Sequence, residues 1–256
     1  MSPEEFAIAI AVGVFICGAL GLVLQRLLPE PYTTGPARDM VGSVVGLLTL
    51  LSALTLGLLI WTAYGVYAGQ NVAVQSLAAK VLQFDMALAD YGPEANPLRA
   101  KLRDAVGKTI DETWNSDVTL QNFVAENFSA ALRNLRDRQK ALDALNPTTD
   151  QQRQALASAK ATMEAIGQSR LQMSFALTAP ISYPIVLTVV AWVALGFLGY
   201  GLMSKGNPTS VVAIVVGALA IGSAFYMILD LSNPYSGAFR TSSAPLEQVL
   251  AVMGKE

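Results

Sequence analysis

Four long stretches of the chain contain no Asp, Glu, Lys or Arg, and they predict four membrane-spanning helices. The stretches are residues 6–25, 40–79, 171–204 and 206–229, and together they form nearly half of the 256 residues. A bilayer core of about 30 Å is crossed by about 20 apolar residues in a helix. The chain is therefore predicted to be an all-α membrane protein with four transmembrane helices.

The boundaries of these helices follow from the residues that flank them. The first is expected over 6–24; an acidic, Lys- and Arg-free segment precedes it and no A-x-A cleavage site follows, so we expect it to be retained. The third begins at Tyr183–Pro184, because proline is tolerated in a first helical turn, and the fourth covers about 211–229.

The second span is expected over 41–66, and its helix is expected to continue outside the membrane. Beyond Gln70 the apolar residues recur with helical spacing, at Val74, Leu77, Val81, Leu82 and Leu88. We expect this continuation to be a rod that couples the membrane part to the region that follows.

The region between the second and third spans is predicted to be helical. One helix follows Asn96-Pro97 and ends near Trp114, a second covers about 120–145, and a third runs from Asp150 towards Leu171. The expected division is residues 1–69 for a first transmembrane hairpin, 70–179 for a helical extramembrane insert, 180–231 for a second hairpin, and 232–256 for a tail that packs on the insert or on a neighbouring subunit.

An even number of crossings places both termini and the insert on one side of the membrane. The basic residues near the span ends do not determine which side, because three lie on each: Arg26, Arg38 and Lys205 against Lys80, Arg170 and Arg240.

The composition excludes several classes of function. The chain is 53% apolar and 14% charged, with a net charge of −2, no histidine and a single cysteine, Cys17. Histidine-based triads, thiolate zinc sites and disulfides within the chain are thereby excluded, and a basic surface for nucleic acid is not expected. We expect no enzyme activity, no cofactor and no metal site.

The second span carries a narrow face of small residues, which has two interpretations. Gly42, Gly46, Thr49, Ala53 and Gly57 fall on one side of the helix, and Ser52, Thr55 and Thr62 extend the arc with hydroxyl groups. Such a face permits close helix packing. It also suits a pore wall, where hydroxyl groups replace part of the hydration shell of an ion.

Aromatic and charged residues near the span ends leave similar alternatives. Ile60, Trp61 and Tyr64 are suited to a hydrophobic constriction or to an aromatic belt at the membrane surface. Asp230 is expected at the end of the fourth span within reach of water, as an interfacial carboxylate, a partner of Arg240 or a vestibule charge. No ionisable Asp, Glu, Lys or Arg falls at mid-membrane depth, which disfavours proton-coupled transport.

The segment after the fourth span carries a specific motif. It reads Leu229-Asp230-Leu231-Ser232-Asn233-Pro234-Tyr235-Ser236-Gly237, and Ser243-Ala-Pro245-Leu246 follows. This resembles the L-D-L-D-R-P-[FY]-S-G signature of the bestrophin-like domain family of membrane proteins, whose function is unknown. Ala37-Arg38-Asp39 before the second span and Ser169-Arg170-Leu171 before the third also fit that family.

The resemblance has two departures. The usual Asp-Arg pair before the proline is Ser232-Asn233 here, and the usual acidic residue after the second span is Gln75. These substitutions remove charges that could select or gate ions.

The resemblance implies an oligomeric ion channel, because the family takes its name from the bestrophin anion channels. We expect a homo-oligomer in the lipid bilayer of a bacterial inner membrane, with termini and insert in the cytoplasm, a pore lined by the second span and a preference for anions as the permeant ion. The alternative is a non-conducting membrane scaffold or sensor that recruits a partner through the helical insert.

Overall fold

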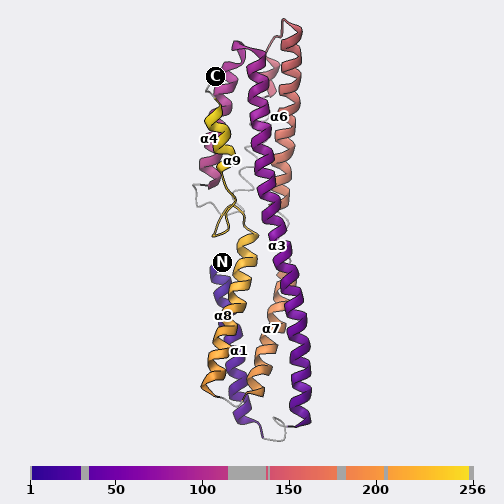
Figure 1. The fold of residues 1–256 in the computed structure, drawn as a ribbon, viewed down its shortest axis with the longest axis vertical. Helices are drawn as coiled ribbons and strands as arrows, with labels where there is room; N and C mark the ends of the chain where they lie inside the picture. Colours follow the sequence, from indigo (N-terminus) through magenta and orange to yellow (C-terminus); the bar gives the residue numbers. More distant parts are fainter. Residues whose placement is uncertain are drawn as a thin grey trace. The chain divides into compact units, whose positions relative to one another are not determined.

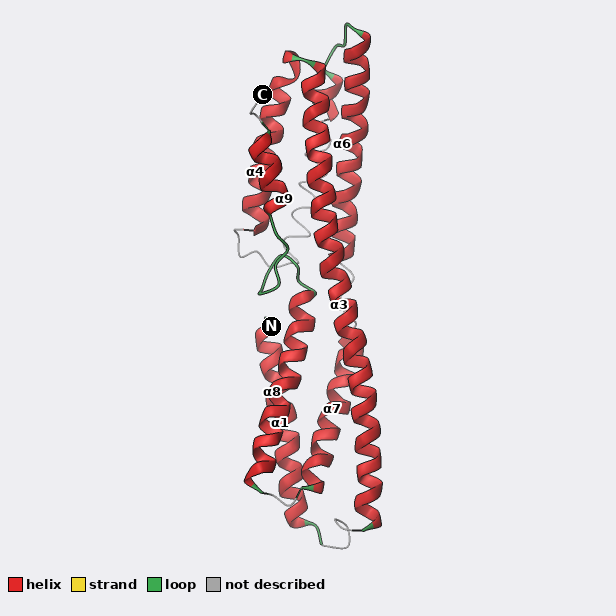
Figure 2. Cartoon of the chain, viewed as in Figure 1, coloured by secondary structure: helices red, strands yellow, loops and turns green. Residues whose placement is uncertain are grey.

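The computed structural model describes a chain whose regular structure is helical throughout the described residues (Figures 1 and 2). These are residues 2–29, 35–114, 137, 139–177, 183–204 and 207–253. The predicted all-helical class is thereby confirmed. The helix predicted over 120–145 lies mostly outside the described residues.

Four helices are long and apolar enough to cross a membrane, which confirms the predicted number among the described residues. They are α1 (Pro3–Leu27), α3 (Pro36–Tyr91), α7 (Tyr183–Met203) and α8 (Pro208–Leu231). The remaining elements are the short 3-10 helix η1 (Pro93–Ala95) and the helices α4 (Asn96–Trp114), α6 (Asp150–Leu177) and α9 (Ala244–Val252). The second predicted helix does continue without a break, since α3 contains 56 residues.

Local chemistry accounts for where several helices begin and end. At the start of α1 the Ser2 side chain accepts a hydrogen bond from the Glu5 backbone N–H, and the Glu5 carboxylate accepts one from the Ser2 N–H. Helix α3 ends before Gly92, whose φ of +116° is incompatible with a continuing helix and rarely adopted by other residues. Thr149 caps α6 by accepting a hydrogen bond from the Gln152 N–H.

The chain divides into two compact units. The first contains residues 1–65 and 180–232, and the second contains residues 66–179 and 233–256. The division between Gly65 and Val66 therefore falls within α3.

In the first unit, α1 packs against both α7 and α8 through small residues. A Cβ on Gly21 would overlap the carbonyl oxygen of Leu198 on α7, and one on Gly201 would lie 2.8 Å from the backbone nitrogen of Leu22. On the other side of α1, a Cβ on Gly222 of α8 would lie 2.8 Å from that of Ala11. The backbones therefore approach as closely as glycine allows, which is the usual way for helices to associate in lipid.

Helix α3 meets α7 in the same unit. Val45 lies over Gly199, where an added Cβ would overlap the valine side chain. The hydroxyl groups of Thr49 and Tyr200 are 2.9 Å apart, and the Arg38 guanidinium donates to the carbonyl oxygen of Met203 at 3.2 Å. The last bond places a cation on the carbonyl end of α7, where the helix dipole favours positive charge.

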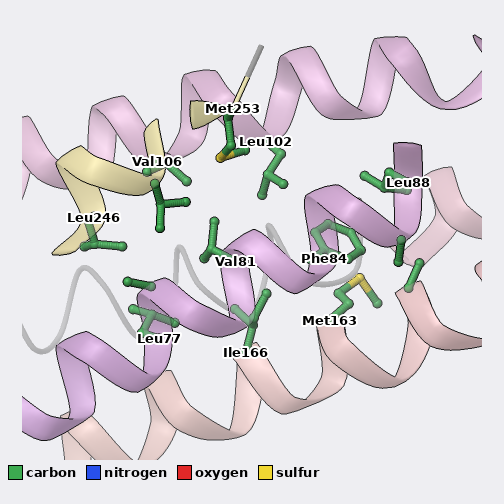
Figure 3. Packing of buried hydrophobic residues seen from close by; sticks show 14 of the residues in the cluster. Leu77, Val81, Phe84, Leu88, Leu102, Val106, Met163, Ile166, Leu246 and Met253 are labelled. Atoms are coloured by element: carbon green, nitrogen blue, oxygen red, sulfur yellow. The ribbon is translucent and has the colours of Figure 1, made fainter. Parts of the chain in front are cut away.

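The second unit has one apolar core (Figure 3). Side chains of α3, α4 and α6 point into it, and α9 adds its own apolar side beside α4. The labelled members are Leu77, Val81, Phe84 and Leu88 of α3, Leu102 and Val106 of α4, Met163 and Ile166 of α6, and Leu246 and Met253 at α9. Apolar residues that recur every four positions on α4 are thus in the core, and α9 is held by the same core.

One ion pair is largely withdrawn from water in this unit. The Arg99 guanidinium donates two hydrogen bonds of 2.9 Å to the two carboxylate oxygens of Asp85, which is buried. This two-point contact fixes the start of α4 against the last turns of α3, because a buried carboxylate is costly without such partners.

The glycine packing of the first unit generates a prediction. Replacing Gly21 by alanine should lower the free energy of unfolding by about 1–3 kcal/mol, because backbone of α7 occupies the space that the new methyl group needs. The measurement is thermal unfolding of the purified full chain in detergent. Gly46→Ala is the matched control, since a Cβ added at Gly46 would meet no described atom within 4 Å outside its own stretch of helix. Equal stability of the two variants would contradict this packing.

Candidate functional site

The membrane part of α3 has one side turned towards its own unit and one side turned away from it. The buried side consists of Val45, Ser52, Leu56, Leu59 and Ala63. These positions repeat every three, four or seven residues, as one face of a helix does. The opposite side is exposed and carries large apolar residues, namely Leu47, Leu50, Leu54, Leu58 and Trp61.

The predicted small-residue arc divides between these two sides. Gly46, Ala53 and Gly57 are exposed, and a Cβ on either glycine would meet nothing within 4 Å. Gly42 faces the Met203 side chain at the border with α7. The close packing that the arc allows is therefore not used within the chain at Gly46 and Gly57, and these two positions are available to a neighbouring subunit, to lipid or to a lumen.

The hydroxyl groups of the arc are engaged with backbone. Thr49, Thr55 and Thr62 each donate to the carbonyl oxygen four residues earlier, at 2.8 Å. Ser52 is buried, and its hydroxyl oxygen has no hydrogen-bond partner among the described residues. Its position on the buried side removes Ser52 from the residues that could face a lumen outside this chain.

The aromatic residues near the end of the span lie on the outward side. Trp61 is 72% exposed and Tyr64 is 51% exposed, whereas Ile60 is half-buried. This arrangement suits both an aromatic belt and a constriction made by several copies, so the two interpretations stay open.

Asp230 is the charged residue of the C-terminal motif. The exposure of its side chain differs from the prediction. It was expected within reach of water, but it is only 1% exposed at the end of α8. The expectation was wrong because the position of a residue at a helix end does not reveal which of its sides is covered. A fully withdrawn carboxylate has a structural role or a role in a protected site, and is not a charge on a surface.

The rest of the motif forms a turn. The Ser236 N–H donates to the Asn233 carbonyl oxygen at 3.1 Å, and Gly237 has a φ of +87°, a conformation that glycine adopts readily. Pro234 is buried, and its carbonyl oxygen accepts hydrogen bonds from both the N–H and the hydroxyl group of Thr241, at 2.7 and 2.8 Å. The segment 234–241 is therefore closed into a loop.

Tyr235 anchors this loop inside the second unit. Its hydroxyl group donates to the side-chain oxygen of Gln70 on α3 at 2.8 Å, and the Gln70 amide nitrogen donates to the carbonyl oxygen of Met173 on α6 at 3.2 Å. Gln70 is only 2% exposed. Burial raises the pKa of the Tyr235 phenol, which keeps it protonated and able to donate.

Trp114 at the end of α4 completes the anchor. Its ring meets that of Tyr235 edge to face, with centroids 5.7 Å apart, and its indole nitrogen donates to the Thr241 carbonyl oxygen at 2.7 Å. We define Gln70, Trp114, Tyr235 and Thr241 as the C-terminal anchor. The sequence analysis missed this set, and the signal for it was a glutamine within the long uncharged stretch 40–79.

Lys80 on α3 and Arg170 on α6 are two cations of the second unit. Lys80 donates to the hydroxyl group of Ser169, and Arg170 follows in sequence. Arg170 is half-buried beside a cavity of about 30 Å³ whose lining is mostly apolar. Burial lowers the pKa of its guanidinium, and the nearby Glu112 carboxylate opposes this effect. Arg170, the basic residue of the predicted Ser169-Arg170-Leu171 step, thus lies beside the apolar core of this unit.

The anchor generates a prediction. Tyr235→Phe should lower the free energy of unfolding by about 1–3 kcal/mol, because it leaves the buried oxygen of Gln70 without a donor. The measurement is a thermal or denaturant unfolding curve of the full chain in detergent. The double variant Tyr235→Phe, Gln70→Leu should recover part of the lost free energy of unfolding, since both side chains of the former hydrogen bond are then apolar. Strictly additive losses would contradict a direct hydrogen bond.

Comparison with known proteins identifies the family. A search of curated proteins and a search of solved structures each returned no match. A family model, the bestrophin-like domain, matches residues 12–246, which includes α1 from residue 12 onward, the whole of α3, α7 and α8, the second unit up to the start of α9, and the C-terminal motif. The chain therefore belongs to the bestrophin-like domain family.

Proposed function

We propose that the protein is an oligomeric ion channel of the bestrophin-related kind, with the outward side of α3 lining a pore between subunits. Family membership supports a channel of this kind. The observation that carries the pore assignment is the exposure of Gly46, Ala53 and Gly57 on a helix whose other side is packed.

The arrangement of α3 suits a pore wall for a physical reason. A glycine that packs against no described residue outside its own helix lowers helix stability, by about 1 kcal/mol relative to alanine, without a gain in packing. Such positions are useful where a neighbouring helix must approach closely or where a water-filled path must stay wide. In an oligomer, adjacent parts of the exposed side can serve both purposes.

Anion preference is the finer part of the proposal and rests on the family's relation to bestrophins. The hydroxyl groups of Thr49, Thr55 and Thr62 donate to backbone carbonyls in the present geometry. They offer oxygen lone pairs in this state and would have to rotate to donate to an anion. Location in a bacterial inner membrane, with termini and second unit in the cytoplasm, belongs to the same proposal.

The test is ion flux from proteoliposomes under opposed chloride and potassium gradients. The expected result is a conductance whose reversal potential follows chloride. A reversal potential that follows potassium would retain the channel and overturn the anion preference. No flux from folded, oligomeric protein would overturn the channel and favour the scaffold, which a specific partner captured by residues 70–179 would support.

A cysteine placed on α3 tests the pore assignment. Cys17 is the single native cysteine, so a Cys17→Ala background allows one thiol to be introduced at a time. A charged thiol reagent should reduce the conductance of Gly57→Cys at least tenfold, because it places a bulky charge in the conducting path. Leu187→Cys is the matched control, since Leu187 is an exposed residue of α7. Equal inhibition of the two variants, or none of either, would contradict a pore lined by α3.

A further inference from the structure

The first unit contains an apolar groove between α1 and α8 that ends at a cation. Its lining consists of Phe15, Ala19, Leu22, Val23 and Arg26 of α1 with Val211 and Ile214 of α8. The groove holds about 210 Å³ of space. One ordered water needs about 10–15 Å³ of such space, and an apolar lining offers water few hydrogen-bond partners. The space therefore suits an apolar occupant better than solvent.

The shape of the groove follows from the residues that line it. Ala19 and Ile214 lie deep in it, whereas Phe15, Val23 and Val211 are exposed along its edges. A small residue on the floor between larger residues at the rim leaves a channel along α1. Because these edge residues are exposed, an occupant can reach the groove from outside the unit.

The groove has the length of one leaflet. Phe15, Ala19, Leu22 and Arg26 follow one another at intervals of four, three and four residues, so they lie on one side of α1. From Phe15 to Arg26 the helix rises about 16 Å. This is half of the bilayer core of about 30 Å, and Arg26 lies in the last turn of α1, where the core ends.

We propose that this groove is a binding site for an anionic phospholipid, with one acyl chain along the apolar lining and the phosphate at Arg26. Charge complementarity carries the choice of occupant. A guanidinium binds phosphate through two parallel hydrogen bonds, and its five donors allow this beside other contacts of the same side chain. Basic groups between membrane helices are a recurring form of site for anionic headgroups.

A second copy of the chain is the competing occupant. It would have to supply an apolar ridge for the groove and an acceptor for Arg26 at the same depth, whereas a phospholipid brings both in one molecule. The proposal does not depend on ion conduction, and its test measures binding only.

The test compares lipids on the delipidated full chain in detergent. Phosphatidylglycerol should raise the unfolding temperature more than phosphatidylcholine, and native mass spectrometry should show it retained. Arg26→Gln should weaken the apparent affinity for phosphatidylglycerol about tenfold, by loss of a charge-assisted contact, and Arg26→Lys should keep part of it. An equal response of the native protein and Arg26→Gln to both lipids would overturn the headgroup assignment.

Filling the groove tests the acyl-chain assignment. Ala19→Trp should abolish lipid retention, whereas Leu20→Trp, on an exposed side of the same helix, should behave as the native protein. Inorganic phosphate alone should produce no stabilisation. The proposal is overturned if Ala19→Trp retains lipid, if phosphate stabilises as well as the lipid does, or if Ala19→Trp changes the oligomeric mass without changing lipid retention.

Discussion

The close approach of α1 to α7 and α8 is the constraint on which the first unit depends. In a bilayer, association of helices gains little from the hydrophobic effect, because lipid tails are as apolar as the side chains they replace. Packing must then come from van der Waals contact, and Gly21, Gly201 and Gly222 allow backbone to reach backbone. Helix α1 lies between two partners as a result, and α3 keeps one long side that is exposed among the described residues.

The second unit is held by a different balance. Its core is apolar in the ordinary way, but the C-terminal anchor joins parts of the chain that are far apart in sequence. The Gln70 amide accepts from Tyr235 and donates to Met173, so both ends of one buried side chain are satisfied. Because an unsatisfied buried amide is costly, these bonds favour the observed placement of the C-terminal motif.

The groove and the small-residue positions are two exposed surfaces of the first unit, and they lie on different helices. The groove that ends at Arg26 belongs to α1 and α8, whereas the small-residue positions Gly46 and Gly57 belong to α3. A lipid at the first and a neighbouring subunit or lumen at the second would therefore not compete for the same helix. Both surfaces are left open for the same reason. The close contacts between α1, α7 and α8 are made at Gly21, Gly201 and Gly222, which belong to neither surface.

The sequence alone determined the features that depend on neighbours along the chain. Runs of apolar residues define the four long helices, and a proline marks where α7 begins. The same local periods also predicted the uninterrupted α3. The bestrophin-like family was evident from the motif near Pro234, which is a local string of residues.

Only the tertiary structure decided which sides of these helices are covered. Gly21, Gly201 and Gly222 pack closely and Gly46 and Gly57 of the α3 arc do not, although all are small residues in apolar helices. Asp230 and Ser52 are buried, and Gln70 finds its partner 165 residues away. Each outcome depends on how segments distant in sequence lie against one another, and periodicity along a helix shows its sides without showing what faces them.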